Sequence, residues 1–160
     1  MINLNEQNYT KINLAAQNEE DLLIFSTLCQ DSIIKISNIK WAKRSKRFYL
    51  LLTRLCWETN YFSKKKDTFF KRVNSILFFD NVLSVKSKGI RQSKSDMIIS
   101  LLTFDYNFSC FDNQSIDLIF SGDAQITIGI ECIEVFLKDV SEPFKSTSSR
   151  LPDHENYYKK

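Results

Sequence analysis

Glycine and proline are scarce in this chain, with three and two residues among 160. Their scarcity excludes collagen-like, glycine-rich and proline-rich low-complexity proteins. The sequence also lacks a run of about 18 apolar residues, so it predicts no transmembrane helix. The first seventeen residues are polar and lack the basic and apolar segments of a secretory signal peptide. We therefore expect a protein of the cytoplasm.

Histidine occurs once, as His154, in a stretch where we expect a solvated tail. Cys29, Cys56, Cys110 and Cys132 lie 27, 54 and 22 residues apart, which matches neither a CxxC metal spacing nor a dense disulfide framework. Each cysteine lies in an apolar stretch, as is typical of a buried and reduced thiol. The sequence therefore predicts no metal site, no cofactor and no catalytic residue.

The most apolar continuous run is Arg47–Glu58. Read with period 2, both of its faces are mostly apolar, which favours a strand covered on both sides. A helix buried all round is the alternative, and the aromatic and β-branched content favours the strand. The chain is 43% hydrophobic and 26% charged, which allows one globular domain with a sizeable core. We place this domain at residues 11–143, between a mobile N-terminus at 1–10 and a mobile tail at 144–160.

Periodicity and turn residues divide the domain into two helices, one short strand and about seven longer strands. The helices are expected at residues 19–30, capped by Asn18, and at 131–140, ended by Pro143. The short strand is expected at residues 11–15, and the others at 33–42, 47–57, 75–79, 82–88, 97–106, 116–120 and 125–130. A bulge is expected at residues 37–38, a left-handed Gly89 after residue 88, and loops at 59–72 and 107–115.

The order of these elements predicts an α+β fold. We expect an antiparallel, about seven-stranded curved sheet or small barrel with an N-terminal helix and a closing C-terminal helix. A pleckstrin-homology-like barrel has this order of strands and closing helix. The alternative is an open antiparallel sheet backed by the two helices. Neither architecture indicates a function by itself.

Charge is distributed very unevenly along the chain. Residues 35–94 hold sixteen Lys or Arg and three Asp or Glu, which gives 16 − 3 = +13. The remaining residues hold six basic and sixteen acidic residues, which gives 6 − 16 = −10, so the net charge is only +3. Such a split can serve an anionic partner, or the basic hairpins can face the acidic segments within the fold.

The basic residues form three groups that are candidates for anion binding. Nearby aromatic residues, Tyr49, Trp57, Tyr61 and Phe62, could stack on bases, so the groups could bind single-stranded nucleic acid or anionic lipid heads. The alternative is that they are solvated loop tips. The groups are Lys43, Arg44, Lys46 and Arg47; Lys64, Lys65 and Lys66; and Lys86, Lys88, Arg91 and Lys94.

Arg54 lies in the middle of the run that should be buried. A buried guanidinium needs a carboxylate or several carbonyl groups. Glu58 is four residues away, about 13 Å along a strand, which is too far for a direct pair. We therefore expect a buried ion pair with Asp80, Asp105 or Glu131, and the alternative is an anion-binding role.

Several short motifs resemble a small bacterial family of unknown function of about 150 residues. The resemblance extends from about Lys11 to His154. It implies a compact cytoplasmic bacterial protein and brings no reaction, cofactor or catalytic residue with it. The motifs are Glu20–Leu22 with Leu28–Ser32, Arg47-Phe48 through Arg54 to Trp57-Glu58, Val82–Val85 with Lys88–Ile90, Leu101-Leu102, Phe120–Gly122, Glu131–Glu134 and Ser149–His154.

Three functional hypotheses follow from these features. The first is a non-enzymatic cytoplasmic interaction module, monomer or homodimer, that binds a macromolecular partner, most simply another protein. The second is a binder of nucleic acid or anionic lipid that uses the basic groups. The third, which we favour least, is an enzyme that uses carboxylates together with Arg54.

Overall fold

The computed structural model describes residues 9–60 and 70–147, whose core is a ten-stranded antiparallel sheet. Within these residues there are two α-helices, α1 (Glu19–Cys29) and α2 (Trp57–Asn60), and a 3-10 turn, η1 (Lys43–Ser45). The strands are β1 (Asn13–Ala16), β2 (Ser32–Ala42), β3 (Arg47–Leu55), β4 (Lys71–Phe79), β5 (Val82–Lys88), β6 (Ile98–Cys110), β7 (Asn113–Phe120), β8 (Gln125–Ile130), β9 (Val135–Asp139) and β10 (Phe144–Lys145).

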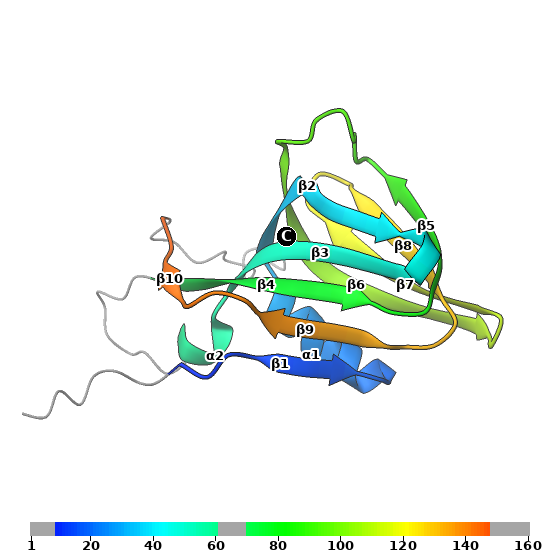
Figure 1. Cartoon of the computed structure of the whole chain (residues 1–160), viewed down its shortest axis with the longest axis horizontal. Helices are drawn as coiled ribbons and strands as arrows, with labels where there is room; N and C mark the ends of the chain where they lie inside the picture. The colour runs from blue at the N-terminus through cyan, green and yellow to red at the C-terminus, as the bar shows by residue number, and fades with distance from the viewer. Residues whose placement is uncertain (1–8, 61–69, 148–160) are drawn as a thin grey trace, which may run out of the picture.

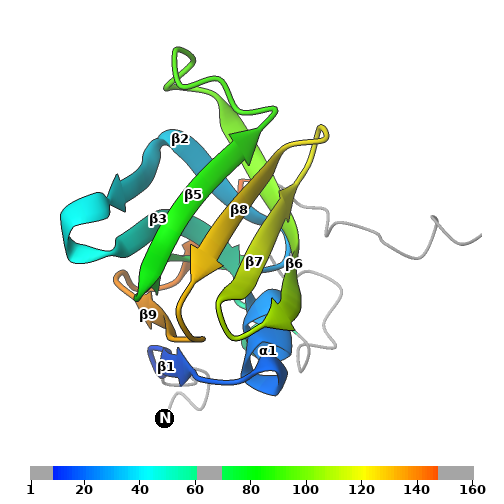
Figure 2. The same ribbon diagram turned by 90° about the vertical axis from the view of Figure 1, so that its right-hand side faces the viewer.

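The sheet curls around a shared interior (Figures 1 and 2). Its strands follow the order β1-β9-β4-β3-β2-β6-β7-β8-β5, and β10 pairs with β4 beside this path. β1 and β5 are therefore the two ends of the path. Most neighbours are close in sequence, but β9 lies between β1 and β4, and β5 pairs with β8. Segments far apart in the chain thus complete both ends of the sheet.

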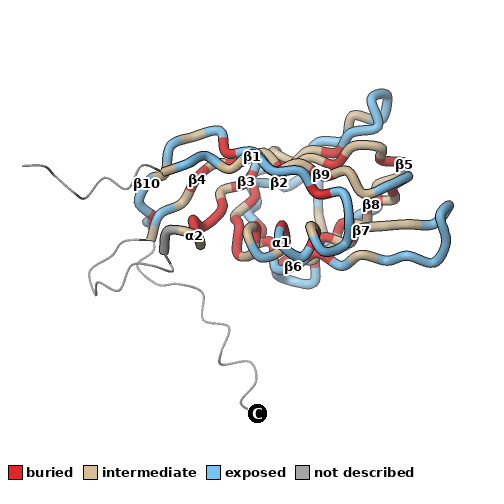
Figure 3. Tube along the Cα trace, turned by 90° about the horizontal axis from the view of Figure 1, so that it is seen from below, coloured by how far each residue is buried: buried red, intermediate tan, exposed pale blue. Residues whose placement is uncertain are grey.

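Alternation of apolar and polar residues places one face of each strand in the interior. In β8, Ile126, Ile128 and Ile130 are buried, and the residues between them are half-buried. β3 follows the same pattern, because Phe48 and Leu50 are buried whereas Leu51 is 40% exposed. The expectation that 47–57 is covered on both faces is therefore wrong. Along these strands, buried residues alternate with half-buried and exposed ones (Figure 3).

Cross-strand aromatic contacts cover part of the outer face. Tyr49 on β3 lies beside Phe78 on β4, with ring centroids 6.1 Å apart. Phe78 in turn stacks on Phe136 of β9 at 4.6 Å. Such pairs stabilise a sheet without a second layer of structure. The apolar content of β3 therefore reflects neighbours within the sheet as well as the core.

The predicted N-terminal helix is present as α1. The Asn18 side chain accepts a hydrogen bond from the Asp21 backbone N–H at 2.9 Å, and this cap begins the helix. Leu22 and Phe25 are buried in the core. The Ser26 hydroxyl accepts a hydrogen bond from the Phe104 N–H at 3.0 Å, which fixes α1 to β6. The helix lies at one end of the interior (Figure 2).

The predicted closing C-terminal helix is wrong, because residues 131–140 contain strand β9. Helical spacing groups Val135 and Phe136, but in the structure Val135, Leu137 and Asp139 alternate into the interior. β9 pairs with β4 on one side and β1 on the other. These long-range pairs outweigh local helical periodicity. With no closing helix, the expected pleckstrin-homology-like arrangement with about seven strands is also wrong.

Other boundaries differ in smaller ways. The expected loop at 107–115 is the end of a hairpin, since β6 extends to Cys110 and β7 begins at Asn113. The expected bulge at residues 37–38 is confirmed by the register shift between Ile34 and Ile39. Gly89 has the expected positive φ, 73°. The two ends of the expected loop at 59–72 overlap α2 and β4. Residues 61–69 of that loop lie outside the described residues, and so do residues 1–8 and 148–160 of the expected mobile ends.

Candidate functional site

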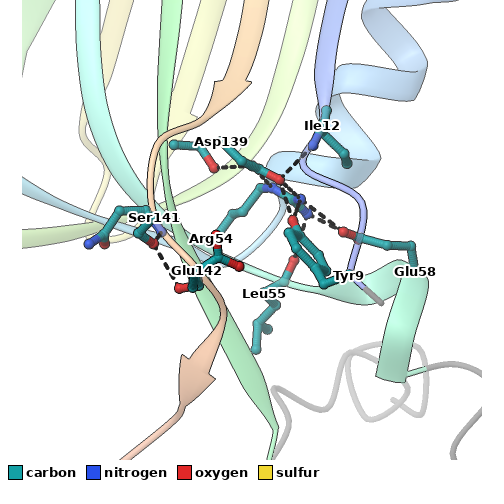
Figure 4. Close-up of polar contacts among 10 residues, drawn as sticks. Tyr9, Ile12, Arg54, Leu55, Glu58, Asp139, Ser141 and Glu142 are labelled. Atoms are coloured by element: carbon teal, nitrogen blue, oxygen red, sulfur yellow. Dashed lines mark hydrogen bonds and ion pairs between the residues drawn. The ribbon is translucent and has the colours of Figure 1, made fainter. Parts of the chain in front are cut away.

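Arg54 on β3 is the largest fully buried side chain, with 0% exposure. Its Nε and Nη2 atoms donate to the two oxygens of Asp139 at 3.0 and 2.9 Å. Its Nη2 and Nη1 atoms also donate to the two oxygens of Glu58, at 2.8 and 3.0 Å. The Leu55 carbonyl and the Tyr9 hydroxyl accept the remaining bonds (Figure 4). The guanidinium is therefore held by two carboxylates at once.

Asp139 is the centre of the same network. Besides Arg54, it accepts hydrogen bonds from the Ser75 hydroxyl at 2.6 Å, from the Ile12 N–H at 2.9 Å and from the Tyr9 hydroxyl. Burial acts to raise the pKa of Asp139, but the bonds from Arg54, Ser75 and Tyr9 outweigh burial and lower it. Burial and the bond to Asp139 raise the pKa of Tyr9, so its phenol stays protonated.

The Arg54 network connects segments that are far apart in the sequence. Arg54 donates six hydrogen bonds to four residues, and Asp139 accepts from four residues. The network therefore joins the N-terminal segment, β3, β4, β9 and α2. The neighbouring thiols are also protected, since burial raises the pKa of Cys29 to about 12 and that of Cys56 to about 11. Neither thiol is poised as a nucleophile at neutral pH.

The partners of Arg54 differ from those expected from the sequence. Glu58 reaches Arg54 because β3 ends at Leu55 and α2 begins at Trp57, so the chain turns back instead of continuing as a strand. Of the three partners proposed, Asp80 pairs with Arg47, Glu131 pairs with Lys46, and Asp105 is exposed on β6. Asp139 was overlooked because residues 131–140 were expected to form a helix, whereas they contain strand β9, on which Asp139 lies opposite Ser75 of β4.

A cleft of about 530 Å³ opens between β2 and β5, and we call it the β2–β5 cleft. Seven of its lining residues are apolar, namely Ile90 and the six residues Ile36, Ile39, Trp41, Phe48, Val85 and Ile126. Ser37, Ser87, Gln92 and Ser95 complete the lining. Trp41 is 37% exposed, so a large aromatic face remains accessible there. An apolar cleft with a few polar groups is typical of a binding site.

Two of the predicted basic groups lie near this cleft, and their members have different surroundings. The Lys43 Nζ lies 5.8 Å from the centroid of the Trp41 ring, a cation–π contact. Lys46 pairs with Glu131 and Arg47 with Asp80, both at 2.9 Å. Within residues 9–60 and 70–147, the exposed side chains of Arg44, Lys86, Lys88, Arg91 and Lys94 form no ion pair.

The remaining site predictions fall on β3, on α2 and outside the described residues. Tyr49 lies on the outer face, against Phe78, and not in the cleft. Trp57 donates its indole N–H to the Gln30 carbonyl at 3.2 Å. Lys64, Lys65, Lys66, Tyr61 and Phe62 lie outside the described residues. Sequence reasoning missed the cleft because its walls come from three separate segments.

Chemical groups suited to catalysis do not gather in this site. None of the eleven described residues that line the cleft carries a side chain that titrates. Across residues 9–60 and 70–147, no cluster of His, Cys, Asp or Glu could hold a metal ion. No helix in the same ranges is long and apolar enough to cross a membrane. The arrangement can enclose an apolar group and offer it a few hydrogen bonds.

The fold and these two sites define an antiparallel β-sheet protein with one covering helix, a buried ionic network and an apolar cleft. The chain belongs to a family described as protein of unknown function DUF2948, which it matches over residues 12–154. This match confirms the family resemblance expected from Lys11 to His154. No curated protein and no solved structure matches the chain.

Replacing Arg54 by Met should lower the free energy of unfolding by about 3–5 kcal/mol, because it leaves Asp139 buried without its cation. The matched control is Arg47→Met, on the same strand. Arg47 is 46% exposed in its pair with Asp80, so its loss should lower the stability far less, because solvent screens an exposed ion pair. Urea unfolding measures both. Equal losses for the two variants would contradict a structural role of the Arg54 network.

The lowered pKa of Asp139 predicts how stability depends on pH. Because the folded-state pKa lies below the unfolded value of about 3.9, the carboxylate stabilises the fold above about pH 4, and this contribution is lost as the pH falls through the folded value. The stability difference between the wild-type protein and Asp139→Asn should therefore shrink below about pH 4. Urea unfolding across this range measures it, and a constant difference would contradict the prediction.

Proposed function

We propose that this protein is a non-enzymatic binding module that recognises a protein partner through the β2–β5 cleft. The cleft itself is the observation that carries the proposal, since its lining combines apolar side chains with a few polar ones. Interfaces are commonly anchored where one large side chain enters such a pocket. A cleft lined without acids, bases or thiols favours binding over turnover.

Trp41 supports this proposal most directly. Its partner in the register, Phe48, is buried, so Trp41 points to the interior side of the sheet. It nevertheless stays partly exposed at the cleft. A tryptophan in this position can cover an entering apolar side chain and keep its indole N–H available to a polar group. Tryptophan is also among the residues that most often carry binding energy in interfaces.

A selection from a library of random linear peptides tests the proposed function. Selected peptides should bind the wild-type protein, and Trp41→Ala should weaken their binding by about 30-fold, the loss of about 2 kcal/mol typical of an interface anchor. The matched control is Phe108→Ala, because Phe108 is an exposed aromatic side chain on β6 outside the cleft. Selected peptides that lose as much affinity with the control, or none with Trp41→Ala, would contradict the proposal.

Binding of a polyanion is a second candidate function, favoured by the exposed cations Arg44, Lys86, Lys88 and Arg91. Single-stranded RNA, duplex DNA and anionic vesicles are the probes. Phosphate contacts release counterions, so raising salt from about 50 to 200 mM should weaken binding by about tenfold or more if several contacts form. The Arg44→Gln, Lys86→Gln and Lys88→Gln variant should reduce this salt dependence. Absence of binding at the lower salt concentration would exclude this function.

The proposed setting is the cytoplasm of a bacterium. Cys29, Cys110 and Cys132 are free thiols, which suits a reducing compartment. We also propose a module that works as a monomer or homodimer. The partner would then reach the cleft from solvent, since the cleft lies at the surface of one copy of the chain.

A further inference from the structure

β5 has an unpaired edge on the side that faces the cleft. The strand pairs with β8 from Val82 to Lys88, and it ends the path of the sheet. Among the described residues, no other strand pairs with it. A free strand edge exposes a row of backbone N–H and C=O groups that can bind another extended chain. β5 therefore offers main-chain hydrogen bonds as well as side chains.

The second half of β2 has an unpaired edge as well. β2 pairs with β6 only as far as Lys35. Two bonds continue this contact, from the Ile36 N–H to the Met97 carbonyl and from the Ser37 N–H to the Ser95 carbonyl. Beyond Ser37, in residues 39–42, β2 pairs only with β3. The cleft is therefore lined by two free strand edges, one from β2 and one from β5.

Hydrogen bonds limit the cleft at both ends. At the start of β5, the Val82 N–H donates to the Lys46 carbonyl at 2.8 Å. At the other end, the bond from the Ser37 N–H to the Ser95 carbonyl is 3.0 Å long. Between these closures, β5 is about 20 Å long at about 3.3 Å per residue. This length fits an extended segment of about five or six residues.

A β-bulge in β5 decides which side chains meet an added strand. The register shifts between Val82 and Ser84, so Val82 points inward and, after the bulge, Val85 and Ser87 line the cleft. Lys86 and Lys88 consequently lie on the outer face, exposed. Lysines and bulges also protect free edges from unspecific pairing. Here they leave an edge that favours a strand with acidic residues on its outer face.

We propose that an extended segment of a protein partner adds to the free edge of β5, with apolar side chains entering the cleft and acidic side chains beside Lys86 and Lys88. This inference rests on the proposed function and specifies its ligand. Charge complementarity selects the acidic residues, and the apolar wall around Trp41 selects the residues between them. Backbone pairing supplies affinity, and alternating pockets supply specificity.

The probe is a blocked seven-residue peptide in which glutamate alternates with valine, bound to the full chain and measured by titration calorimetry. It should bind, and replacement of its glutamates by lysine should weaken binding at least tenfold. Lys86→Glu with Lys88→Glu should weaken binding of the glutamate peptide to a similar degree. Lys138→Glu is the matched control, because Lys138 is exposed on β9. Equal binding of both peptides would overturn the charge complementarity.

Backbone methylation tests the pairing itself. Alternate amides of an extended peptide point to opposite edges, so methylating the glutamate amides blocks one edge and methylating the valine amides blocks the other. At least one methylated peptide should lose tenfold or more in affinity. If both retain the affinity of the parent, strand addition is overturned while cleft binding stands. If no acidic peptide binds, this inference fails, and the library selection with Trp41→Ala decides the proposed function separately.

Discussion

The buried ion pair between Arg54 and Asp139 constrains several elements of the fold at once. It joins β3 to β9 across 85 residues of sequence, and β4 lies between these strands in the sheet. Neither charge could stay in the interior alone, since an unpaired buried ion is costly. Tyr9, Ile12 and Ser75 donate the other hydrogen bonds that the Asp139 carboxylate accepts. The network thereby fixes the register of β9 and the start of β1 at one end of the sheet.

The Arg54 network includes none of the residues that line the β2–β5 cleft, so the cleft stays available for the proposed binding. α1 and the Arg54 network close and hold one part of the interior, and the chain from β5 to β8 completes the other part. The curled sheet does not close between β5 and the end of β2, which leaves the β2–β5 cleft. The ionic network and the cleft are built from different residues, so the cleft can be altered without removing the network.

The sequence allowed the local elements to be predicted, because their signals are local. The cap at Asn18 and the alternation in β8 each lie within a few residues. β9 was mistaken for a helix because its pairing partners are about 60 and 120 residues away, and with it the partner of Arg54 was missed. The cleft could not be predicted, since the parity change at the bulge in β5 depends on its pairing with β8.

Residue-resolved amide hydrogen exchange of the free protein measures directly whether β5 keeps an open edge above a folded core. Alternate amides of β5 point toward β8 and toward the cleft. If the edge of β5 is open, the amides that face β8 should exchange slowly, and those that face the cleft should exchange at least tenfold faster. The amides of β3 and β4 should be protected throughout. Uniform slow exchange along Val82–Lys88 would show that the edge is already covered and would contradict an open edge.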